Sequence, residues 1–179
     1  MRITAGEFRS RTLSVPDIDG LRPTSSRVRE ALFNILGDIE GWRILDLFSG
    51  SGIMAIEALS RGAEHAISIE QDRNACQYLR PLAEKFHVEK CWQIQQASLP
   101  KALDGMQNQH FDWIFADPPY DVGMAEKIPL WLQHANITTA SLVIEESVRA
   151  KPQWPQGWKA SSRRYGDTNL YFLEQELHS

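Results

Sequence analysis

The chain has 179 residues, of which 42% are hydrophobic and 23% are charged, and its formal net charge is −4. This length suits a single folded domain, and the negative charge argues against a general polyanion binder. The two cysteines, Cys76 and Cys91, exclude a disulfide framework, and the five histidines lack the spacing of metal ligands. Neither a signal-peptide core nor a membrane-length apolar run is visible, so we expect a cytoplasmic protein without a metal or a membrane partner.

The first thirty residues differ in charge from the rest of the chain. They hold six arginines against four acidic residues, so a basic arm precedes an acidic body. Arginine binds phosphate in a bidentate manner, which favours local contact with a nucleic acid. Pairing of the same arginines with the acidic body is an equally open alternative. Residues 1–20 are predicted to form short strands and turns in a small hairpin.

A helix is predicted to begin at Ser25 or Ser26, either of which can cap it, and to end near Leu36. Its packing face consists of Val28, Ala31, Leu32 and Ile35. We expect three arginines on its solvent side or at its start, namely Arg22, Arg27 and Arg29.

Predicted strands and helices alternate from Trp42 onward. The strands are expected near residues 43–48, 65–70, 91–96, 111–116 and 141–146, and the helices near 53–61, 72–86, 99–105 and 123–134. This alternation predicts an α/β fold with a parallel sheet and helices on both faces. Residues 158–174 are predicted to add two strands joined by a turn at Gly166 and Asp167.

A glycine-rich turn, residues 49–52, joins the first of these strands to its helix. Glycine lets the backbone turn sharply and approach a ligand, and the following helix N-terminus offers free N–H groups. The sequence therefore predicts a nucleotide-type pocket here.

Two ligand classes fit this turn. Gly50 to Ala55 matches G-x-G-x-x-A, and Glu70 follows Gly50 by 20 residues, which is the pattern of a dinucleotide site with a ribose-binding acid. S-adenosylmethionine instead carries an ammonium and a sulfonium group. Asp46, just before the glycines, suits such a cation and repels a pyrophosphate. The acidic residues favour S-adenosylmethionine, with a turn that binds no ligand as the third alternative.

The residues Asp117, Pro118, Pro119 and Tyr120 follow the strand predicted near 111–116. The prolines end the strand, because neither can donate a hydrogen bond to a neighbouring strand. Asp117 and the Pro118 carbonyl can accept hydrogen bonds from an exocyclic amino group, and Tyr120 can stack on the ring that carries it. A plain turn is the alternative.

These motifs together resemble class I S-adenosylmethionine-dependent methyltransferases. More narrowly, the chain resembles the bacterial small-subunit ribosomal RNA guanine-N2 methyltransferase family RsmD. The sheet motifs identify the superfamily, and the N-terminal arginine block narrows the resemblance to this family. The matching residues are 2–6, 11–13, 21–24, 27–36, 45–52, 57–63, 117–120 and 165–168.

The resemblance implies a Rossmann-like, mostly parallel seven-stranded sheet with a C-terminal antiparallel strand and a small N-terminal extension of a hairpin and a helix. It implies one domain, 1–179, with an RNA-contacting extension at 1–40 and a cofactor-binding core at 41–179. It further implies that a monomer methylates N2 of guanine 966 in 16S rRNA, within an assembling 30S subunit.

The resemblance also implies three sets of site residues. The catalytic set is Asp117, Pro118 and Tyr120. The set that binds S-adenosylmethionine is Asp46, Phe48, Ser49, Gly50, Gly52, Glu70, Gln71, Ser98 and Asp117. The RNA-binding set is Arg2, Arg9, Arg11, Arg22, Thr24 and Arg27.

Three positions depart from the family pattern. Ala55 stands where a glycine is common, which matters little because both residues are small. Pro81 stands where the family usually has asparagine, and Ser98 stands where an acid often contacts the adenine amino group. The Ser98 hydroxyl is a weaker substitute for that acid. Three other functions stay open: methylation of amino groups in DNA, an NAD-dependent oxidoreductase, and an RNA-binding assembly factor without catalysis.

Overall fold

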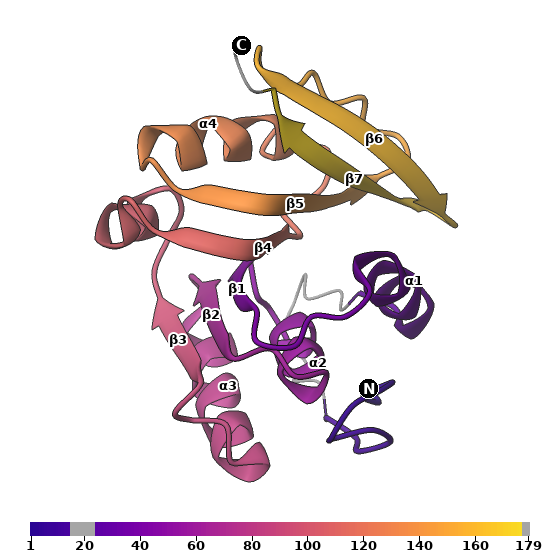
Figure 1. Ribbon diagram of the computed structural model, residues 1–179, viewed down its shortest axis with the longest axis vertical. Coiled ribbons are helices and arrows are strands. Elements are labelled where there is room, and N and C mark those ends of the chain that lie inside the picture. The colour runs from indigo at the N-terminus through magenta and orange to yellow at the C-terminus, as the bar shows by residue number, and fades with distance from the viewer. Residues whose placement is uncertain (15–23, 177–179) are drawn as a thin grey trace. The chain divides into compact units, whose positions relative to one another are not determined.

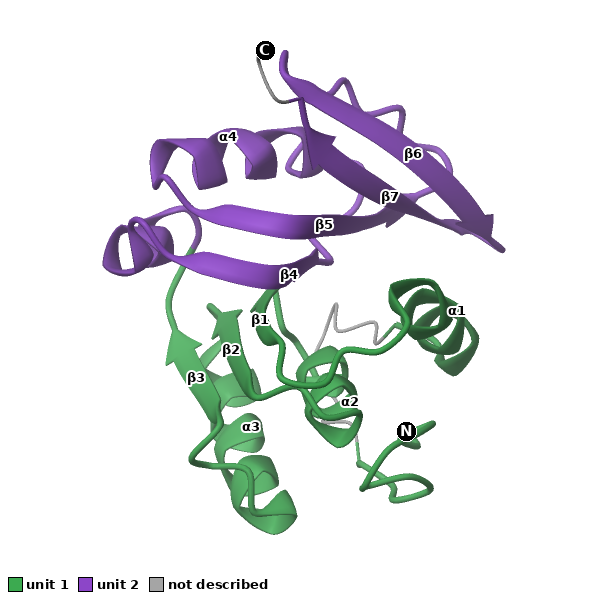
Figure 2. Cartoon of the chain, in the orientation of Figure 1, with its two compact units in different colours: residues 1–98 green, residues 99–179 purple. Residues whose placement is uncertain are grey.

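The computed structural model describes residues 1–14 and 24–176, and the chain divides into two compact units, residues 1–98 (unit 1) and 99–179 (unit 2) (Figure 2). The described part of the predicted extension, residues 1–40, belongs to unit 1. The proposed division into extension and core therefore stays a prediction.

Unit 1 contains a parallel sheet with the strand order β3-β2-β1 (Figure 1). Leu45 of β1 pairs with Ile67 of β2, and Ile67 pairs with Gln93 of β3. Residues 44–47 are all buried, as expected for a strand that is covered on both faces. The elements are α1 (Ser26–Leu36), β1 (Arg43–Leu47), α2 (Ile53–Ser60), β2 (His65–Glu70), α3 (Arg73–Phe86) and β3 (Trp92–Gln96).

Side-chain caps begin two of these helices. Ser25 Oγ accepts a hydrogen bond from the Val28 N–H at 3.3 Å, which selects between the two predicted caps of α1. Asp72 Oδ1 accepts a hydrogen bond from the Ala75 N–H at 2.8 Å at the start of α3. The helix α3 continues through Pro81 and ends at a left-handed His87.

The N-terminal residues form the predicted small hairpin as far as they are described. Arg2 and Thr12 make an antiparallel bridge, and Leu13 N–H donates to the Met1 carbonyl at 2.7 Å. Ile3, Phe8 and Leu13 are buried. The hairpin is thus a packed element of unit 1, while residues 15–20 of the predicted hairpin lie outside the described residues.

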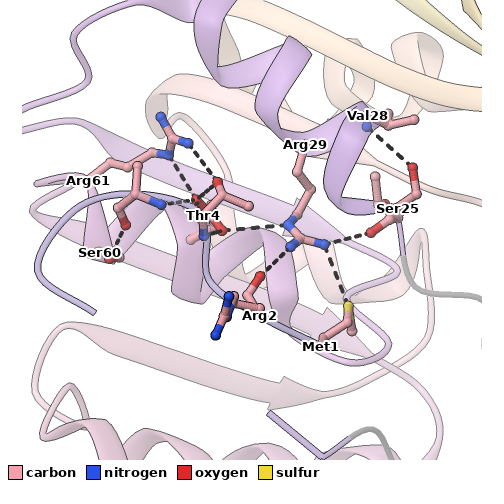
Figure 3. A network of polar contacts seen from close by, with 11 residues as sticks. Met1, Arg2, Thr4, Ser25, Val28, Arg29, Ser60 and Arg61 are labelled. Atoms are coloured by element: carbon pink, nitrogen blue, oxygen red, sulfur yellow. Dashed lines mark hydrogen bonds and ion pairs between the residues drawn. The ribbon is translucent and has the colours of Figure 1, made fainter. Parts of the chain in front are cut away.

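Glu57 of α2, which is fully buried, anchors this hairpin through a polar network. Figure 3 labels three of its partners, Thr4, Arg29 and Arg61. Its carboxylate accepts hydrogen bonds from the Thr4 N–H at 3.0 Å and the Ala5 N–H at 3.2 Å. It also pairs with Arg61 Nε at 3.0 Å and Arg29 Nε at 3.6 Å. Because residues 4 and 5 of the hairpin are tied to a buried carboxylate, we infer that the described hairpin is a fixed surface of unit 1.

The prediction for Arg29 was wrong. Its side chain is fully buried, and its guanidinium donates to the Thr24 carbonyl at 2.8 Å and the Arg2 carbonyl at 2.7 Å (Figure 3). Burial lowers the pKa of Arg29, and Glu57 opposes that shift. An arginine on the packing face of a helix is stable only where a carboxylate and carbonyls satisfy it, and a single-sequence pattern does not reveal such partners.

Unit 2 contains strands in the order β4-β5-β7-β6 (Figure 1). β4 and β5 are parallel, and β7 is antiparallel to both β5 and β6. The terminal hairpin turns at Gly166 and Asp167 as predicted and places one antiparallel strand in the sheet. The elements are η1 (Lys101–Met106), β4 (His110–Ala116), η2 (Ala125–Lys127), α4 (Ile128–His134), β5 (Thr138–Ser147), β6 (Trp158–Tyr165) and β7 (Thr168–Gln175).

Two helices of unit 2 differ from prediction. The segment predicted near 99–105 is a short 3-10 helix, Lys101–Met106, which contains the weak helix former Gly105. The helix predicted over 123–134 is split into the 3-10 turn η2 and the shorter α4. Pro129, which lies in the first turn of α4, fits a helix start and disfavours a continuous helix through that point.

Candidate functional site

The glycine turn after β1 has a backbone that few residues adopt. Phe48, Gly50 and Gly52 have φ angles of 62°, 52° and 70°. A Cβ atom on Gly52 would lie 2.4 Å from Leu79 Cδ2 and 2.8 Å from the ring of Trp92. Both the left-handed conformation and the close packing therefore require glycine at position 52.

A buried hydrogen-bond network supports this turn. Ser49 Oγ donates to Asp46 Oδ2 at 2.8 Å and lies 2.9 Å from Ser68 Oγ, which accepts a hydrogen bond from Trp92 Nε1 at 2.9 Å. Asp46 is only 2% exposed. Burial raises the pKa of the Asp46 carboxyl to about 7, with hydrogen bonds from Ser49 and from the Ala55 backbone opposing the shift and the charge of Glu70 adding to it. In this structure Asp46 orders the turn itself, and its role toward a cofactor stays a prediction.

Glu70 lies at the end of β2 and connects the turn to α3. Its Oε2 atom accepts a hydrogen bond from the Gly50 N–H at 2.8 Å, and its Oε1 atom accepts one from the Asp72 N–H at 2.7 Å. The side chain is half-buried, and a carboxylate oxygen accepts more than one hydrogen bond. Glu70 can therefore also accept from the two hydroxyls of a ribose. Gln71 and Ser98 are exposed after β2 and β3.

The segment after β4, residues 117–120, which we call the step after β4, has side chains that differ in exposure. Pro118 is buried, Pro119 is exposed, and Asp117 and Tyr120 are half-buried. The Tyr120 hydroxyl donates to Glu145 Oε1 at 2.9 Å. Burial raises the pKa of Tyr120 far above its usual range, and the negative charges of Asp117 and Glu145 raise it further. Tyr120 therefore has a neutral side chain, and its hydroxyl group is held in place by Glu145.

Glu146, the residue after Glu145, binds the backbone of Asp121, the residue after Tyr120. Its Oε1 atom accepts hydrogen bonds from the Asp121 N–H at 3.3 Å and the Ser147 N–H at 2.7 Å. Burial raises the pKa of Glu146. A cavity of about 230 Å³ lies beside it, lined by Asp121, Gly123, Ala125, Glu126, Glu146, Ala150, Lys151 and Pro152. Two consecutive residues at the end of β5 thus fix the segment that carries Asp117 and Tyr120.

The predicted RNA-binding residues have different surroundings. Arg2, Arg9 and Arg27 are exposed. Arg11 is also exposed and lies over the Phe86 ring, 4.8 Å from its centroid. Thr24 is buried, at 4% exposure, and Arg22 lies outside the described residues.

The described residues contain no group of three or more histidine, cysteine, aspartate or glutamate side chains that could hold a metal ion. In the same part of the chain, no helix combines the length and hydropathy needed to cross a bilayer.

Within unit 1, the predicted cofactor residues form two hydrogen-bonded pairs, Ser49 with Asp46 and Gly50 with Glu70, and the two carboxyl groups interact electrostatically. Within unit 2, Asp117 acts electrostatically on Tyr120. Sequence reasoning missed Ser68, Trp92, Glu145 and Glu146, which support these residues. The only signal in the sequence was the acidic pair at the end of a predicted strand, residues 145–146.

The chain is similar to known proteins over nearly its whole length. A family model described as "Conserved hypothetical protein 95" matches residues 1–174. The Ribosomal RNA small subunit methyltransferase D of Haemophilus influenzae is 36% identical over 163 residues, which cover 88% of this chain and 84% of that protein. The protein of the same name from Escherichia coli K12 is 33% identical over 179 residues, covering 98% and 89%.

The chain belongs to the ribosomal RNA small subunit methyltransferase D family. The solved structure of the Escherichia coli protein yhhF is 31% identical and has a TM-score of 0.84, with 98% of both chains covered. The resemblance to this methyltransferase family is thus confirmed. The predicted class I methyltransferase fold, mostly parallel with an antiparallel strand near the C-terminus, is confirmed as well.

Proposed function

We propose that this protein is an S-adenosylmethionine-dependent methyltransferase that modifies N2 of a guanine in 16S rRNA of the small ribosomal subunit. The relatives named above supply the RNA class, since they are small-subunit rRNA methyltransferases by name. The observation that carries the chemistry is the rigid step after β4, where Asp117, the Pro118 carbonyl and the held Tyr120 ring stand together in sequence.

The cofactor is assigned to unit 1. The turn at Gly50 and Gly52 brings backbone close to a ligand without a Cβ atom in the way, and Glu70 holds the ribose hydroxyls. Phe48 and Gln71 flank this surface, and Ser98 or a backbone carbonyl takes the adenine amino group. The residues present fit S-adenosylmethionine better than a dinucleotide, because two acidic side chains, Asp46 and Glu70, stand at the turn that a pyrophosphate would face.

The amino group of the target base is assigned to the step after β4. S-adenosylmethionine supplies an electrophilic methyl group on a cationic sulfur atom. Asp117 and the Pro118 carbonyl accept hydrogen bonds from the two N2 hydrogens and stabilise the positive charge that develops on the nitrogen. As the N–C bond forms and the C–S bond breaks, one N2 proton leaves to Asp117 or to solvent.

Tyr120 holds the base itself. Stacking of a base on an aromatic ring contributes about 1–3 kcal/mol, and the target guanine must leave its own stack to reach such a ring. The exposed arginines of the anchored hairpin, Arg2, Arg9 and Arg11, together with Arg27, contact RNA phosphates. The proposal also specifies guanine 966 as the target base and an assembling 30S particle as the substrate. The enzyme itself is proposed to be a cytoplasmic monomer.

Two other functions are weighed against this one. An amino-group methyltransferase of DNA would use the same Asp-Pro-Pro-Tyr step, but the family relatives named here are rRNA methyltransferases. An NAD-dependent oxidoreductase would use the same glycine pattern, but the acids around the turn disfavour it.

The test is methyl transfer from labelled S-adenosylmethionine to small subunits from a strain that lacks this protein, with duplex DNA as the comparison. We expect label on N2 of one guanine of 16S rRNA and none on DNA. Label on DNA alone, or on no RNA base, contradicts the proposal. Calorimetric titration with S-adenosylmethionine and with NAD separates the methyltransferase from the oxidoreductase.

A further inference from the structure

The outer strand of unit 2 is basic and uncovered. β6 pairs with β7 at the outer edge of the strands of unit 2 (Figure 1). Six of its eight residues, 159–164, are exposed. It contains Lys159, Arg163 and Arg164 and no acidic residue. A run of positive charge on an otherwise acidic chain attracts a polyanion locally.

The strand register places the two arginines at the same end of the sheet as the proposed amine-binding step. Ala116 of β4 pairs with Ile144 of β5, so Asp117 and Glu145 come next in the same row. Glu145 pairs with Leu170, which pairs with Arg163. Residues paired across strands share a face, and strands lie about 4.8 Å apart, so Arg163 lies about 10 Å from Glu145.

A third arginine joins this pair from the segment after β5. Val148 N–H donates to the Asp167 carbonyl at 3.0 Å, which brings Arg149 beside the turn between β6 and β7. Arg164 Nε donates to the Gly166 carbonyl at 2.9 Å in the same turn. Arg149, Arg163 and Arg164 form no ion pair with any residue the structure describes. All three residues lie near the turn between β6 and β7, although Arg163 and Arg164, as consecutive strand residues, point to opposite faces of β6. We call these three residues the C-terminal arginine cluster.

We propose that the C-terminal arginine cluster binds phosphates of the RNA strand that flank the target nucleotide. The inference rests on the proposed function, because it needs an RNA strand whose base is held at the step after β4. Arginine suits this role, since its planar guanidinium binds a phosphate in a bidentate manner. The N-terminal hairpin and this cluster belong to different units, so each can be tested by itself.

The test is binding of small subunits from a strain that lacks this protein, measured across a range of salt concentrations. The variant Arg149→Gln/Arg163→Gln/Arg164→Gln is compared with Lys159→Gln. Lys159 is the matched control, because it lies near the other end of the same strand and pairs with Glu176 at 2.9 Å. The variant should bind several-fold more weakly. The slope of log affinity against log salt should fall by about 0.7 for each phosphate that the variant no longer binds.

Two further measurements make the result decisive. Affinity for S-adenosylmethionine should be the same in the variant, the control and the wild type. A photo-crosslinking amino acid in place of Arg163 should label RNA. An unchanged salt slope, or crosslinks to ribosomal protein alone, overturns the inference. Because binding is measured directly, failure here is distinct from failure of the proposed function, which appears as absence of methyl transfer by the wild type.

Discussion

The Tyr120 hydroxyl donates a 2.9 Å hydrogen bond to Glu145 Oε1, which joins the step after β4 to the buried end of β5. Glu145 is only 4% exposed, so water competes little for this contact. A ring that is fixed before the base arrives loses less conformational entropy on binding. Glu145 is therefore a positioning residue for Tyr120 under the proposed function.

This relationship predicts non-additive kinetics. Tyr120→Phe keeps the ring but loses its anchor, and Glu145→Leu removes the partner, so each should lower kcat/KM for small subunits by about tenfold, as expected for a hydrogen bond to a charged group. The double variant should be little worse than either single variant. Glu145→Gln, which keeps an acceptor oxygen, should recover part of the loss. Strictly multiplicative losses in a double-mutant cycle argue that the two residues act independently.

Glu57 is expected to dominate the stability of unit 1. Glu57→Ala leaves the charge of Arg29 buried without a carboxylate, which should cost about 3–5 kcal/mol in the free energy of unfolding. Arg61→Ala removes a partner that is 17% exposed and leaves Arg29 paired with Glu57, so it should cost less than Glu57→Ala. Urea denaturation measures both, and trypsin should cut after Arg9 or Arg11 faster in Glu57→Ala. Equal losses in the two variants would rule out the buried carboxylate as the anchor.

The raised pKa of Asp46 predicts that the free energy of unfolding depends on pH. Its pKa is raised from 3.8 to about 7 in the folded protein, so between these values the unfolded chain releases a proton that the folded protein keeps. The stability that this group contributes is thus present below about pH 4 and is lost as pH rises to about 7. Relative to Asp46→Asn, the wild type should lose a few kcal/mol between about pH 4 and pH 7 and little more above that, at about 1.4 kcal/mol per pKa unit. Urea denaturation at several pH values measures this, and a constant difference refutes it.

Much of the fold was predictable because its signals are local. The period of the apolar residues indicated the strands of both units, and Ser25 and the turn at Gly166 marked element ends. The 3-10 helix Lys101–Met106 was less predictable, since a six-residue segment with a glycine has little periodicity. Buried charge was not predictable at all. Arg29 has the position of a solvent-side arginine until Glu57, which lies 28 residues further along the chain, is brought to it.

The candidate site shows the same contrast. The glycine turn and the Asp-Pro-Pro-Tyr step each consist of consecutive residues, so their residues could be named directly from the sequence. Glu145 lies on β5, the strand paired with β4, and Ser68 lies on β2, the strand paired with β1. Only this strand pairing shows that they hold Tyr120 and Ser49. Supporting residues of this kind have no motif, because any acceptor that the register brings into reach can serve.

The most direct test of the account is the Asp117→Ala variant. Single-turnover methyl transfer to small subunits is measured at saturating S-adenosylmethionine, and cofactor affinity is measured by calorimetry. We predict a transfer rate at least about a hundredfold below that of the wild type, because Asp117 is proposed to stabilise charge on the reacting nitrogen. Cofactor affinity should stay within about twofold, because the other residues proposed to bind the cofactor are unchanged. A variant that transfers methyl groups at the wild-type rate would contradict the account.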